Sequence, residues 1–375
     1  MADCPGIFLL AQMKDGGLAR VRLPGGRLDA AQARAVAAFA RRWGNGLIDL
    51  TNRANLQVRG LPPALPDDAV ADLDRAGLVP AMRGADRLRN ITADPLSGLD
   101  PGEIIDVTPL VADLDAALQT ADLDGLSPKF AFVLDGGGRS AIAGVGHDIG
   151  FIACPSGFRL SLGGRVGAEV IAPGDVVARA VAEARAILAA GRRRPGTAGS
   201  LNPWLGPVRQ RDGRFAVALD VPVARADAAL VERLADLALA EGDGQLRLTP
   251  WSAVLLTGIP QSRVAAVIAA SGLSTAIGPR VVACAGATGC ERGLADTKGD
   301  GRALAAALGG QGGGTVHLAG CSKGCAHPGA ADILALARPD GSYDLHRQAR
   351  AGAAASPWAE GVEPAAMIEE LARAS

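Results

Sequence analysis

Hydrophobic and polar positions repeat along this chain at a constant spacing. Residues 46–62 read GLIDLTNRANLQVRGLP, and residues 244–260 read GQLRLTPWSAVLLTGIP. Thr51 matches Thr249 and Gly60 matches Gly258 at one offset, since 249 − 51 = 198 and 258 − 60 = 198. A gap-free match that extends upstream over about 45 positions is hard to attribute to chance, so the sequence indicates an internal duplication.

Each copy predicts the order strand, helix, strand, strand. The apolar stretch 18–23 pairs with 216–221, and a helix at 30–43 falls opposite one at 227–240. Asp29 suits the N-cap of the first helix, and glycines follow both helices. We therefore expect an α+β chain with two pseudo-symmetric repeats, each a βαββ half-domain followed by an α/β lobe. The expected boundaries are 1–70 and 205–265 for the half-domains, and 75–200 and 270–375 for the lobes, with linkers at 61–66 and 191–207.

Composition excludes several classes of function. A chain of 375 residues should form two or three domains. Its net charge of −1 and 3% aromatic content favour neither nucleic acid nor an anionic membrane as a partner. No run of about 18 apolar residues predicts a membrane span. The apolar run 7–11 is too short for a signal peptide, so the expected location is the cytoplasm.

The cysteines carry the clearest chemical signal. Four of the six have the spacing C-x5-C, thirty residues, C-x3-C, and they are Cys284, Cys290, Cys321 and Cys325. Four clustered thiolates suit zinc or an iron–sulfur cluster. Structural zinc sites favour two to four residues between paired cysteines, and a spacing of five lies outside that range. Glycines in both loops would let backbone N–H groups approach cluster sulfides. The pattern predicts a [4Fe–4S] cluster, with zinc or inert thiols as the alternative.

This cysteine spacing at the end of a duplicated βαββ chain resembles the sulfite and nitrite reductase hemoprotein family. Four further segments resemble family motifs: Thr51–Gln57, Arg89–Ile91, Ser127–Phe130 and His147–Gly150. The resemblance implies ferredoxin-like half-domains and a [4Fe–4S] cluster on the four cysteines. It also implies that Cys325 bridges to the iron of a siroheme.

Three cations from the matched segments are candidates for catalytic residues. Arg53, Arg89 and Lys129 could converge on an anion above a metal centre, and the alternative is ordinary surface charge. Lys129 stands before an apolar stretch in a chain with only four lysines, which favours a function. We expect all three to line one cavity that reaches Cys325. His327 could ligate or hydrogen-bond an iron, or be structural.

The chain departs from the reductases at two places. Ala131 stands where the family's reductases carry a second lysine, and the last loop reads Gly-Cys-Ser-Lys-Gly-Cys-Ala-His-Pro. The ending is most similar to the monooxygenase branch of the family, which belongs to the aerobic cobalamin pathway. This resemblance implies hydroxylation of the tetrapyrrole precorrin-3A at C20 with O2 and closure of a γ-lactone.

The sequence lacks a G-x-G-x-x-G dinucleotide fingerprint, so electrons from NADH would arrive through a reductase partner. Whether siroheme or a mononuclear non-haem iron stands beside the cluster stays open at this point. The alternatives are a siroheme-dependent sulfite or nitrite reductase and, in a different class, a non-catalytic iron–sulfur electron carrier or a zinc-stabilised scaffold.

Overall fold

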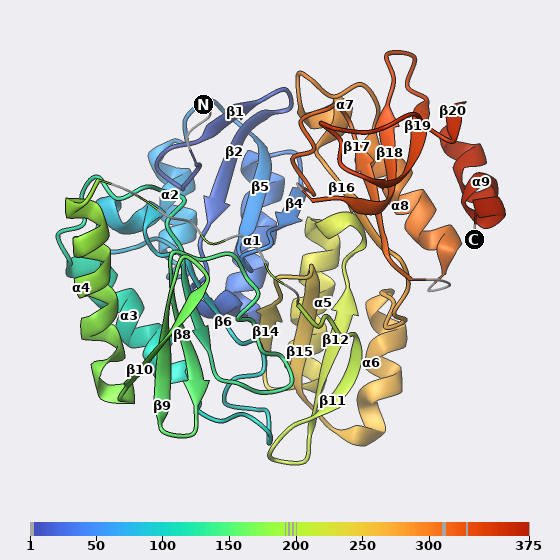
Figure 1. Ribbon diagram of the computed structural model, residues 1–375. Coiled ribbons are helices and arrows are strands. Elements are labelled where there is room, and N and C mark those ends of the chain that lie inside the picture. The colour runs from blue at the N-terminus through green and yellow to red at the C-terminus, as the bar shows by residue number, and fades with distance from the viewer. Residues whose placement is uncertain are drawn as a thin grey trace. The chain divides into compact units, whose positions relative to one another are not determined.

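The computed structural model describes residues 4–374, except 192, 194, 195, 197, 198, 200, 310–312 and 328. The chain forms two compact units (Figure 1). The first consists of residues 1–11, 17–220 and 226–274, and the second of residues 12–16, 221–225 and 275–375. Part of the expected linker 191–207 lies outside the described residues. None of the helices in the described part of the chain is long and apolar enough to cross a membrane.

The first unit contains both βαββ copies except residues 12–16 and 221–225, which belong to the second unit. The first copy supplies β1 (Ala11–Met13), β2 (Gly16–Val21), β3 (Arg27–Asp29), α1 (Ala30–Trp43), β4 (Leu47–Leu50) and β5 (Leu56–Leu61). The second supplies β11 (Gly206–Arg209), β12 (Phe215–Asp220), β13 (Arg225–Asp227), α5 (Ala228–Glu241), β14 (Gln245–Leu248) and β15 (Ala253–Ile259). Asp29 and Asp227 cap α1 and α5, accepting from the backbone N–H of Gln32 and Leu230. The predicted bounds of the first helix are confirmed.

Each copy completes the sheet of the other. The sheet orders are β1-β2-β5-β4-β13 and β11-β12-β15-β14-β3, so β3 and β13 are exchanged between the copies. Matching hydrogen bonds run from Ala30 N to Gly244 O and from Ala228 N to Gly46 O, both 2.9 Å. The helices α1 and α5 pack against each other. The expected pseudo-two-fold pairing is confirmed.

Five pairs of residues that are 198 positions apart have left-handed backbone conformations in both copies. Such conformations are rare outside glycine, so their recurrence at one offset is specific. The pairs, with φ values, are Gly25 (68°) and Val223 (50°), Gly26 (69°) and Ala224 (56°), Gly46 (78°) and Gly244 (77°), Ala54 (54°) and Ser252 (69°), and Gly60 (69°) and Gly258 (72°).

The first lobe is a five-stranded sheet of order β10-β9-β8-β7-β6. Its strands β6, β7 and β8 are parallel, and β8, β9 and β10 are antiparallel. Figure 1 shows α3 and α4 beside this sheet, and their apolar faces share its core. The elements are β6 (Ile91–Ala93), α3 (Thr108–Thr120), β7 (Phe132–Asp135), β8 (Ile149–Cys154), β9 (Gly157–Leu162), β10 (Arg165–Ile171) and α4 (Val176–Ala189).

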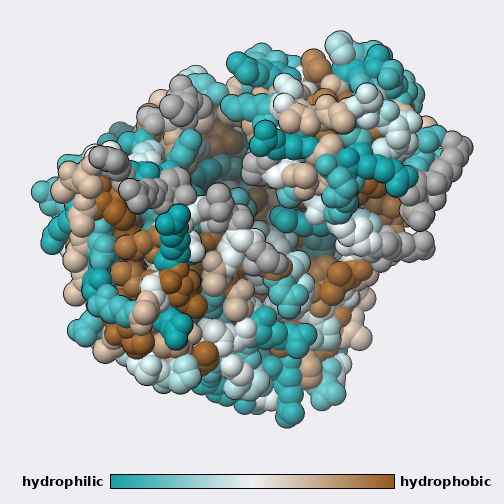
Figure 2. All heavy atoms as spheres, in the orientation of Figure 1, coloured by the Kyte–Doolittle hydropathy of each residue, from teal (hydrophilic) through white to brown (hydrophobic). Residues whose placement is uncertain are grey.

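Apolar surface is visible over the region of β9, β10 and α4 in Figure 2. The exposed apolar side chains of β9 and β10 are Leu162, Val166 and Val170. Two further helices of the first unit are α2 (Asp67–Asp74) and α6 (Val264–Ser271).

The second unit repeats the topology of the first lobe. Its order is β16-β17-β18-β19-β20, with the first three strands parallel and the rest antiparallel. Ala93 pairs with Leu134 in the first lobe as Ala283 pairs with Leu318 here, so Asp94 corresponds to Cys284. The elements are β16 (Arg280–Ala283), α7 (Gly286–Gly289), α8 (Thr297–Leu308), β17 (Thr315–Ala319), β18 (Ala331–Ala337), β19 (Tyr343–Ala349), β20 (Ala359–Val362) and α9 (Met367–Ala374).

Candidate functional site

The four clustered cysteines lie on two loops of the second unit. Cys284 directly follows β16 and Cys290 directly follows α7, whereas Cys321 and Cys325 lie in the loop after β17. Because β16 and β17 are parallel neighbours, their carboxyl ends meet at one edge of the sheet. Sheet topology therefore brings both cysteine pairs to the same edge of the sheet.

The other three cysteines of the group influence the pKa of Cys325. Burial raises the pKa of Cys325, Lys323 lowers it, and Cys284, Cys321 and Cys290 each add to the rise. Cys325 is nevertheless exposed, while the other three are half-buried. Among the described residues, no group of three or more His, Cys, Asp or Glu side chains could hold a metal ion. Four cysteine thiolates are the ligand set of a [4Fe–4S] cluster, and they also suit zinc.

The residues around the cysteines fit such a cluster. The backbone N–H of Gly320 donates to Cys284 Sγ at 3.2 Å, and a Cβ on Gly320 would stand 3.2 Å from the same sulfur. His317 lies under the second loop, 3.7 Å from where a Cβ of Gly324 would be. His317 is fully buried, and its two ring nitrogens find no hydrogen-bond partner among the described residues. An orphaned buried donor under the loop that carries Cys321 and Cys325 suits a group rich in acceptor sulfides. That the four cysteines are its ligands stays a prediction.

His327 stands close to His317, with ring centroids 5.7 Å apart in an edge-on arrangement. Its Nε2 lies 3.2 Å from the carbonyl oxygen of Ala330, which can only accept, so Nε2 carries the hydrogen. Nδ1 is then the ring nitrogen left for another partner. The role of His327 toward an iron stays a prediction.

Arg53 and Lys129 line one pocket of about 280 Å³ in the first unit. We call it the cation pocket, and its charged and polar lining includes Cys4, Arg20, Arg53, Asn55, Lys129 and Arg193. Arg53 Nη1 and Arg193 Nη2 both donate to the carbonyl oxygen of Lys129, at 3.1 and 2.6 Å. Segments that are far apart in the sequence thus meet around one carbonyl.

The cation pocket has a strongly positive lining. Burial, reinforced by Arg20 and Arg193, lowers the pKa of Arg53. Arg193 is neutralised by Asp148, with Nε 2.8 Å from Oδ1. No carboxylate stands among the described lining residues, so an anion in the pocket would meet the charges of Arg20, Arg53 and Lys129.

A tight loop directs Arg53 into this pocket. Thr51 Oγ1 accepts from the backbone N–H of Arg53 at 3.3 Å and from that of Asn55 at 3.0 Å. Ala54 takes a left-handed φ of 54°, which closes the loop between β4 and β5. Asn55 is buried. Its Oδ1 accepts from Leu23 N at 2.8 Å, and its Nδ2 donates to Asn90 Oδ1 at 3.1 Å.

Three lining residues were not among the sequence candidates. Arg20 belongs to β2, and its Nη1 donates to Cys4 Sγ at 2.8 Å. Cys4 has no partner at motif spacing, and Arg193 belongs to a run of arginines that reads as a solvated end. The signal that could have found Arg20 is its place on the strand that pairs with Leu56–Leu61, since Arg20 lies opposite Gln57 of the matched motif.

Arg89 is not in the cation pocket, and the expectation that all three cations line one cavity is wrong for this residue. Arg89 lines a second cavity and forms a bidentate ion pair with Asp115 of α3. Its Nε lies 2.6 Å from Oδ1 and its Nη2 2.8 Å from Oδ2. The physical reason is the carboxylate, which α3 presents to the buried guanidinium. That the cation pocket reaches Cys325 stays a prediction.

Ala131, which replaces the second lysine of the reductases, is buried and lies on the polypeptide that frames the pocket. Its N–H donates to Asp148 Oδ2 at 2.9 Å, and Asp148 N donates back to its carbonyl at 2.9 Å. The same Asp148 holds Arg193. The pocket therefore contains Lys129 without a second lysine beside it.

Comparison with known proteins agrees with this architecture. The family model of the nitrite/sulfite reductase ferredoxin-like half domain matches residues 11–76 and 208–272, and that of the nitrite and sulphite reductase 4Fe-4S domain matches residues 84–190. The solved structure of the NirA protein of Mycobacterium tuberculosis superposes with a TM-score of 0.71 at 19% identity, covering 95% of this chain and 80% of that one. The chain belongs to the nitrite and sulfite reductase family and is an iron–sulfur oxidoreductase.

Two curated relatives are similar to the chain to the same degree. A precorrin-3B synthase from Sinorhizobium is 29% identical, over 90% of this chain and 81% of the relative. A ferredoxin–nitrite reductase from Synechococcus elongatus is also 29% identical, over 88% of this chain and 77% of the relative. Both reactions are thus represented among its relatives, and the choice between them rests on the site.

Proposed function

We propose that the chain is a precorrin-3B synthase-like monooxygenase that hydroxylates precorrin-3A at C20. In this reaction one atom of O2 enters the substrate and the other leaves as water, with two electrons and two protons supplied from NADH and solvent. The ring-A acetate then closes the γ-lactone. A cluster on Cys284, Cys290, Cys321 and Cys325 would supply electrons one at a time.

The observation that carries the proposal is the composition of the cation pocket. Reduction of sulfite or nitrite to fully protonated products needs cations and proton donors close to a small anion. Here Ala131 is buried against Asp148 where a second lysine would stand. The cations that remain, Arg20, Arg53 and Lys129, suit fixed carboxylates, because guanidinium groups bind them in a bidentate manner.

The chain's own residues have distinct tasks in this proposal. Arg53 and Lys129 would hold carboxylate arms of the tetrapyrrole, and Arg20 would reinforce the positive field. Asp148 positions Arg193 and the backbone at Ala131, so it acts through its neighbours and does not touch substrate. The pocket is in the unit that lacks the clustered cysteines, which separates substrate binding from electron supply in the sequence.

Single-turnover chemistry tests the proposal. Protein purified without oxygen is reduced, mixed with precorrin-3A and exposed to ¹⁸O2, and the product is analysed by mass spectrometry. We expect one labelled oxygen atom in the product, and a lactone signature in its fragmentation. Reduction of nitrite or sulfite by the same preparation, with unchanged precorrin-3A, would reject the proposal in favour of the reductase alternative. Siroheme absorption bands in the purified protein would point the same way.

The residue assignment needs a separate test. Arg53→Ala should lower turnover with precorrin-3A and leave the absorbance of the cluster intact, because Arg53 is not a ligand. Ala131→Lys should not by itself create sulfite reduction. Loss of the cluster in Arg53→Ala would assign Arg53 to structure and leave its substrate role without support.

A further inference from the structure

His317 is a polar exception on one face of the second unit's sheet. Its neighbours in β17, Val316 and Leu318, pack into the main core of this unit, so His317 points to the opposite face. The buried residues that cluster on that face are Ala319, Leu334, Ala349 and Ala351. An apolar side chain would serve packing there, and a fully buried histidine costs free energy unless its ring nitrogens are paired.

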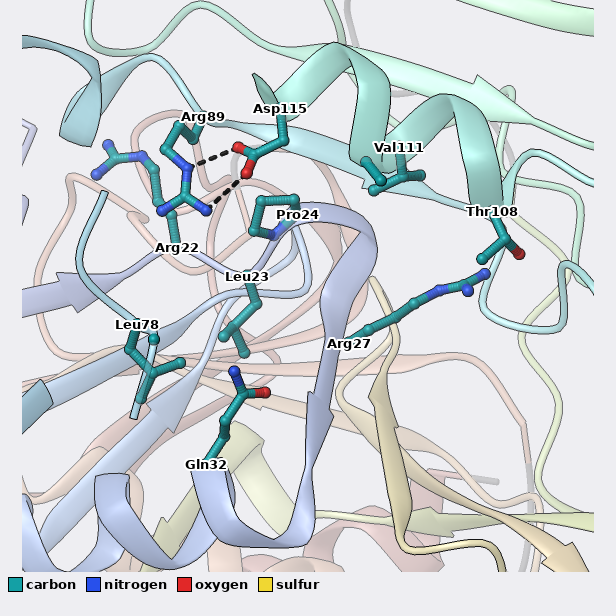
Figure 3. A pocket seen from close by; sticks show the side chains of 12 residues that line it. Arg22, Leu23, Pro24, Arg27, Gln32, Leu78, Arg89, Thr108, Val111 and Asp115 are labelled. Atoms are coloured by element: carbon teal, nitrogen blue, oxygen red, sulfur yellow. Dashed lines mark hydrogen bonds and ion pairs between the residues drawn. The ribbon is translucent and has the colours of Figure 1, made fainter. Parts of the chain in front are cut away.

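Two buried polar side chains of the first unit show how such groups are ordinarily paired. His147 has an oxygen atom within 2.8 Å of each ring nitrogen. Figure 3 shows Arg89 facing Asp115, with Nε 2.6 Å from Oδ1 and Nη2 2.8 Å from Oδ2. Neither ring nitrogen of His317 has a partner among the described residues. A buried imidazole in this state indicates that a partner is missing.

The nitrogen-bearing end of the His317 ring points to the loop that carries Cys321 and Cys325. Its Cε1 atom stands 3.7 Å from where a Cβ on Gly324 would be, and Cε1 is bonded to both ring nitrogens. The ring of His327 lies on the same side, with the two centroids 5.7 Å apart. Gly324 and His327 stand on either side of Cys325 in the sequence. The unpaired nitrogens are therefore held beneath the stretch that carries a predicted cluster ligand.

The His317 ring is neutral near pH 7. Burial, with a smaller contribution from His327, lowers the pKa of His317 to about 4. A neutral imidazole carries one N–H donor and one acceptor nitrogen. The sulfides and thiolates of an iron–sulfur cluster are acceptors, so they match the donor of this ring.

We propose that His317 donates a hydrogen bond to a sulfur of the cluster and thereby raises its reduction potential. The acceptor is a sulfide or a thiolate sulfur at the loop of Cys321 and Cys325. Reduction adds one negative charge to the cluster, so the N–H group stabilises the reduced form more than the oxidised form. His317 neither ligates iron nor touches substrate in this assignment. The inference deepens the proposed function and rests on the cluster assigned there.

Redox titration of the full chain, purified without oxygen and followed by electron paramagnetic resonance, measures the effect. His317→Leu removes the N–H group. At the wild-type midpoint potential, the ratio of reduced to oxidised cluster should fall about tenfold in this variant, a shift of about −59 mV for one electron. His317→Gln keeps an N–H donor and should recover most of the loss.

His346→Leu is the matched control. His346 is also buried with unpaired ring nitrogens among the described residues. It lies on the same face two strands from His317, since Leu334 pairs with both. Its variant should keep the wild-type potential. An unchanged potential in His317→Leu, or an equal fall in His346→Leu, would overturn the proposal in favour of a packing role.

Pulsed electron paramagnetic resonance of reduced protein labelled with ¹⁵N-histidine tests the contact itself. We expect a weak ¹⁵N coupling in the wild type, its loss in His317→Leu and its persistence in His346→Leu. A coupling that survives in His317→Leu belongs to another histidine and contradicts the proposal. The wild-type spectrum decides the matter if His317→Leu does not hold a cluster.

The same sample separates this inference from the proposed function. A wild type without an iron–sulfur cluster removes the proposed function and the inference together. An intact cluster without ¹⁵N coupling overturns the role of His317 and leaves the proposed function standing.

Discussion

The two lobes share one sheet topology but fill the loops after their first two parallel strands differently. In the first lobe Asp94 directly follows β6 and Asp135 is the last residue of β7, and both are buried. Asp94 Oδ1 accepts from Leu96 N at 2.9 Å, and Asp135 Oδ2 accepts from Ile142 N and Ala143 N at 3.0 and 2.7 Å. These loops close on themselves through carboxylate-to-backbone hydrogen bonds.

In the second unit the same loops carry thiols. Among the described residues, only the sulfur of Cys284 has hydrogen-bond partners out of the four clustered cysteines. The comparison shows that one sheet topology carries loops closed by carboxylates in the first lobe and loops that contain thiols in the second unit. It favours a bound cluster as the group that satisfies the second set of loops.

The largest expected effect comes from removing one thiol. Cys290→Ser should abolish the cluster, because serine oxygen is a poor substitute for a soft thiolate ligand. Iron and sulfide content and visible absorbance of protein purified without oxygen measure the loss. Cys154→Ser, in the first lobe, is the matched control and should keep the full cluster. Full iron content in Cys290→Ser would break the comparison between the lobes.

The two βαββ copies give a second comparison, at the loop that holds Arg53 in one and Trp251 in the other. Trp251 is buried, and its ring lies tilted against that of Trp204 with centroids 6.2 Å apart. Its Nε1 donates to the carbonyl oxygen of Trp204 at 3.1 Å. Trp251→Ala should therefore cost about 3–5 kcal/mol of unfolding free energy. Arg53→Ala should change it by about 1 kcal/mol or less while lowering turnover. Chemical denaturation compares the two, and the reverse ranking would contradict the division into a core copy and a binding copy.

The buried carboxylates of the first lobe predict an unusual pH dependence. Burial raises the pKa of Asp94 from 3.8 to about 6. Since the folded state then binds the proton more tightly, the ionised form lowers stability above about pH 6, and that cost disappears as the pH falls below about 4. Asp94→Asn should remove a cost of up to about 3 kcal/mol at pH 8.

Urea unfolding of Asp94→Asn and the wild type at pH 8 and pH 5 checks this prediction. The advantage of the variant should shrink at the lower pH. A variant that is destabilised equally at both values would show that the hydrogen bonds of Asp94, and not its charge, dominate.

The smallest effects concern the left-handed turns that the two copies share. A Cβ on Gly26 would stand 2.7 Å from the Cβ of Ala54 and 2.9 Å from Leu248 O, so Gly26→Ala should cost at least about 1–2 kcal/mol. Ala224, its counterpart, already holds φ at 56° with a side chain. Ala224→Gly should be neutral or stabilising by about 0.5 kcal/mol. Thermal unfolding of both variants tests whether the two copies differ in backbone strain at this turn, although they share its conformation.

The sequence predicted the fold well because the duplication is gap-free and each helix has a clear cap. Asp29 and Gly44 marked the two ends of the first helix. The constant offset then predicted the helix of the second copy. The exchange of β3 and β13 could not be predicted, because strand order depends on contacts between segments about two hundred residues apart.

The candidate site was predictable only where motifs carried it. Cysteine spacing and the Thr51–Gln57 segment led to the second-unit loops and to Arg53. Arg89 was misplaced because its partner, Asp115, comes from a helix that no motif marks. Arg20 and Cys4 escaped because isolated residues acquire meaning only when the fold brings them together.

Metal analysis with electron paramagnetic resonance on anaerobically purified protein tests the central claim most directly. The account predicts about four irons and four sulfides per chain and, after reduction, the signal of a [4Fe–4S]⁺ cluster. Both should be lost in Cys290→Ser and kept in Cys154→Ser. Zinc alone in the wild type, or a cluster that survives Cys290→Ser, would contradict the assignment of the four cysteines.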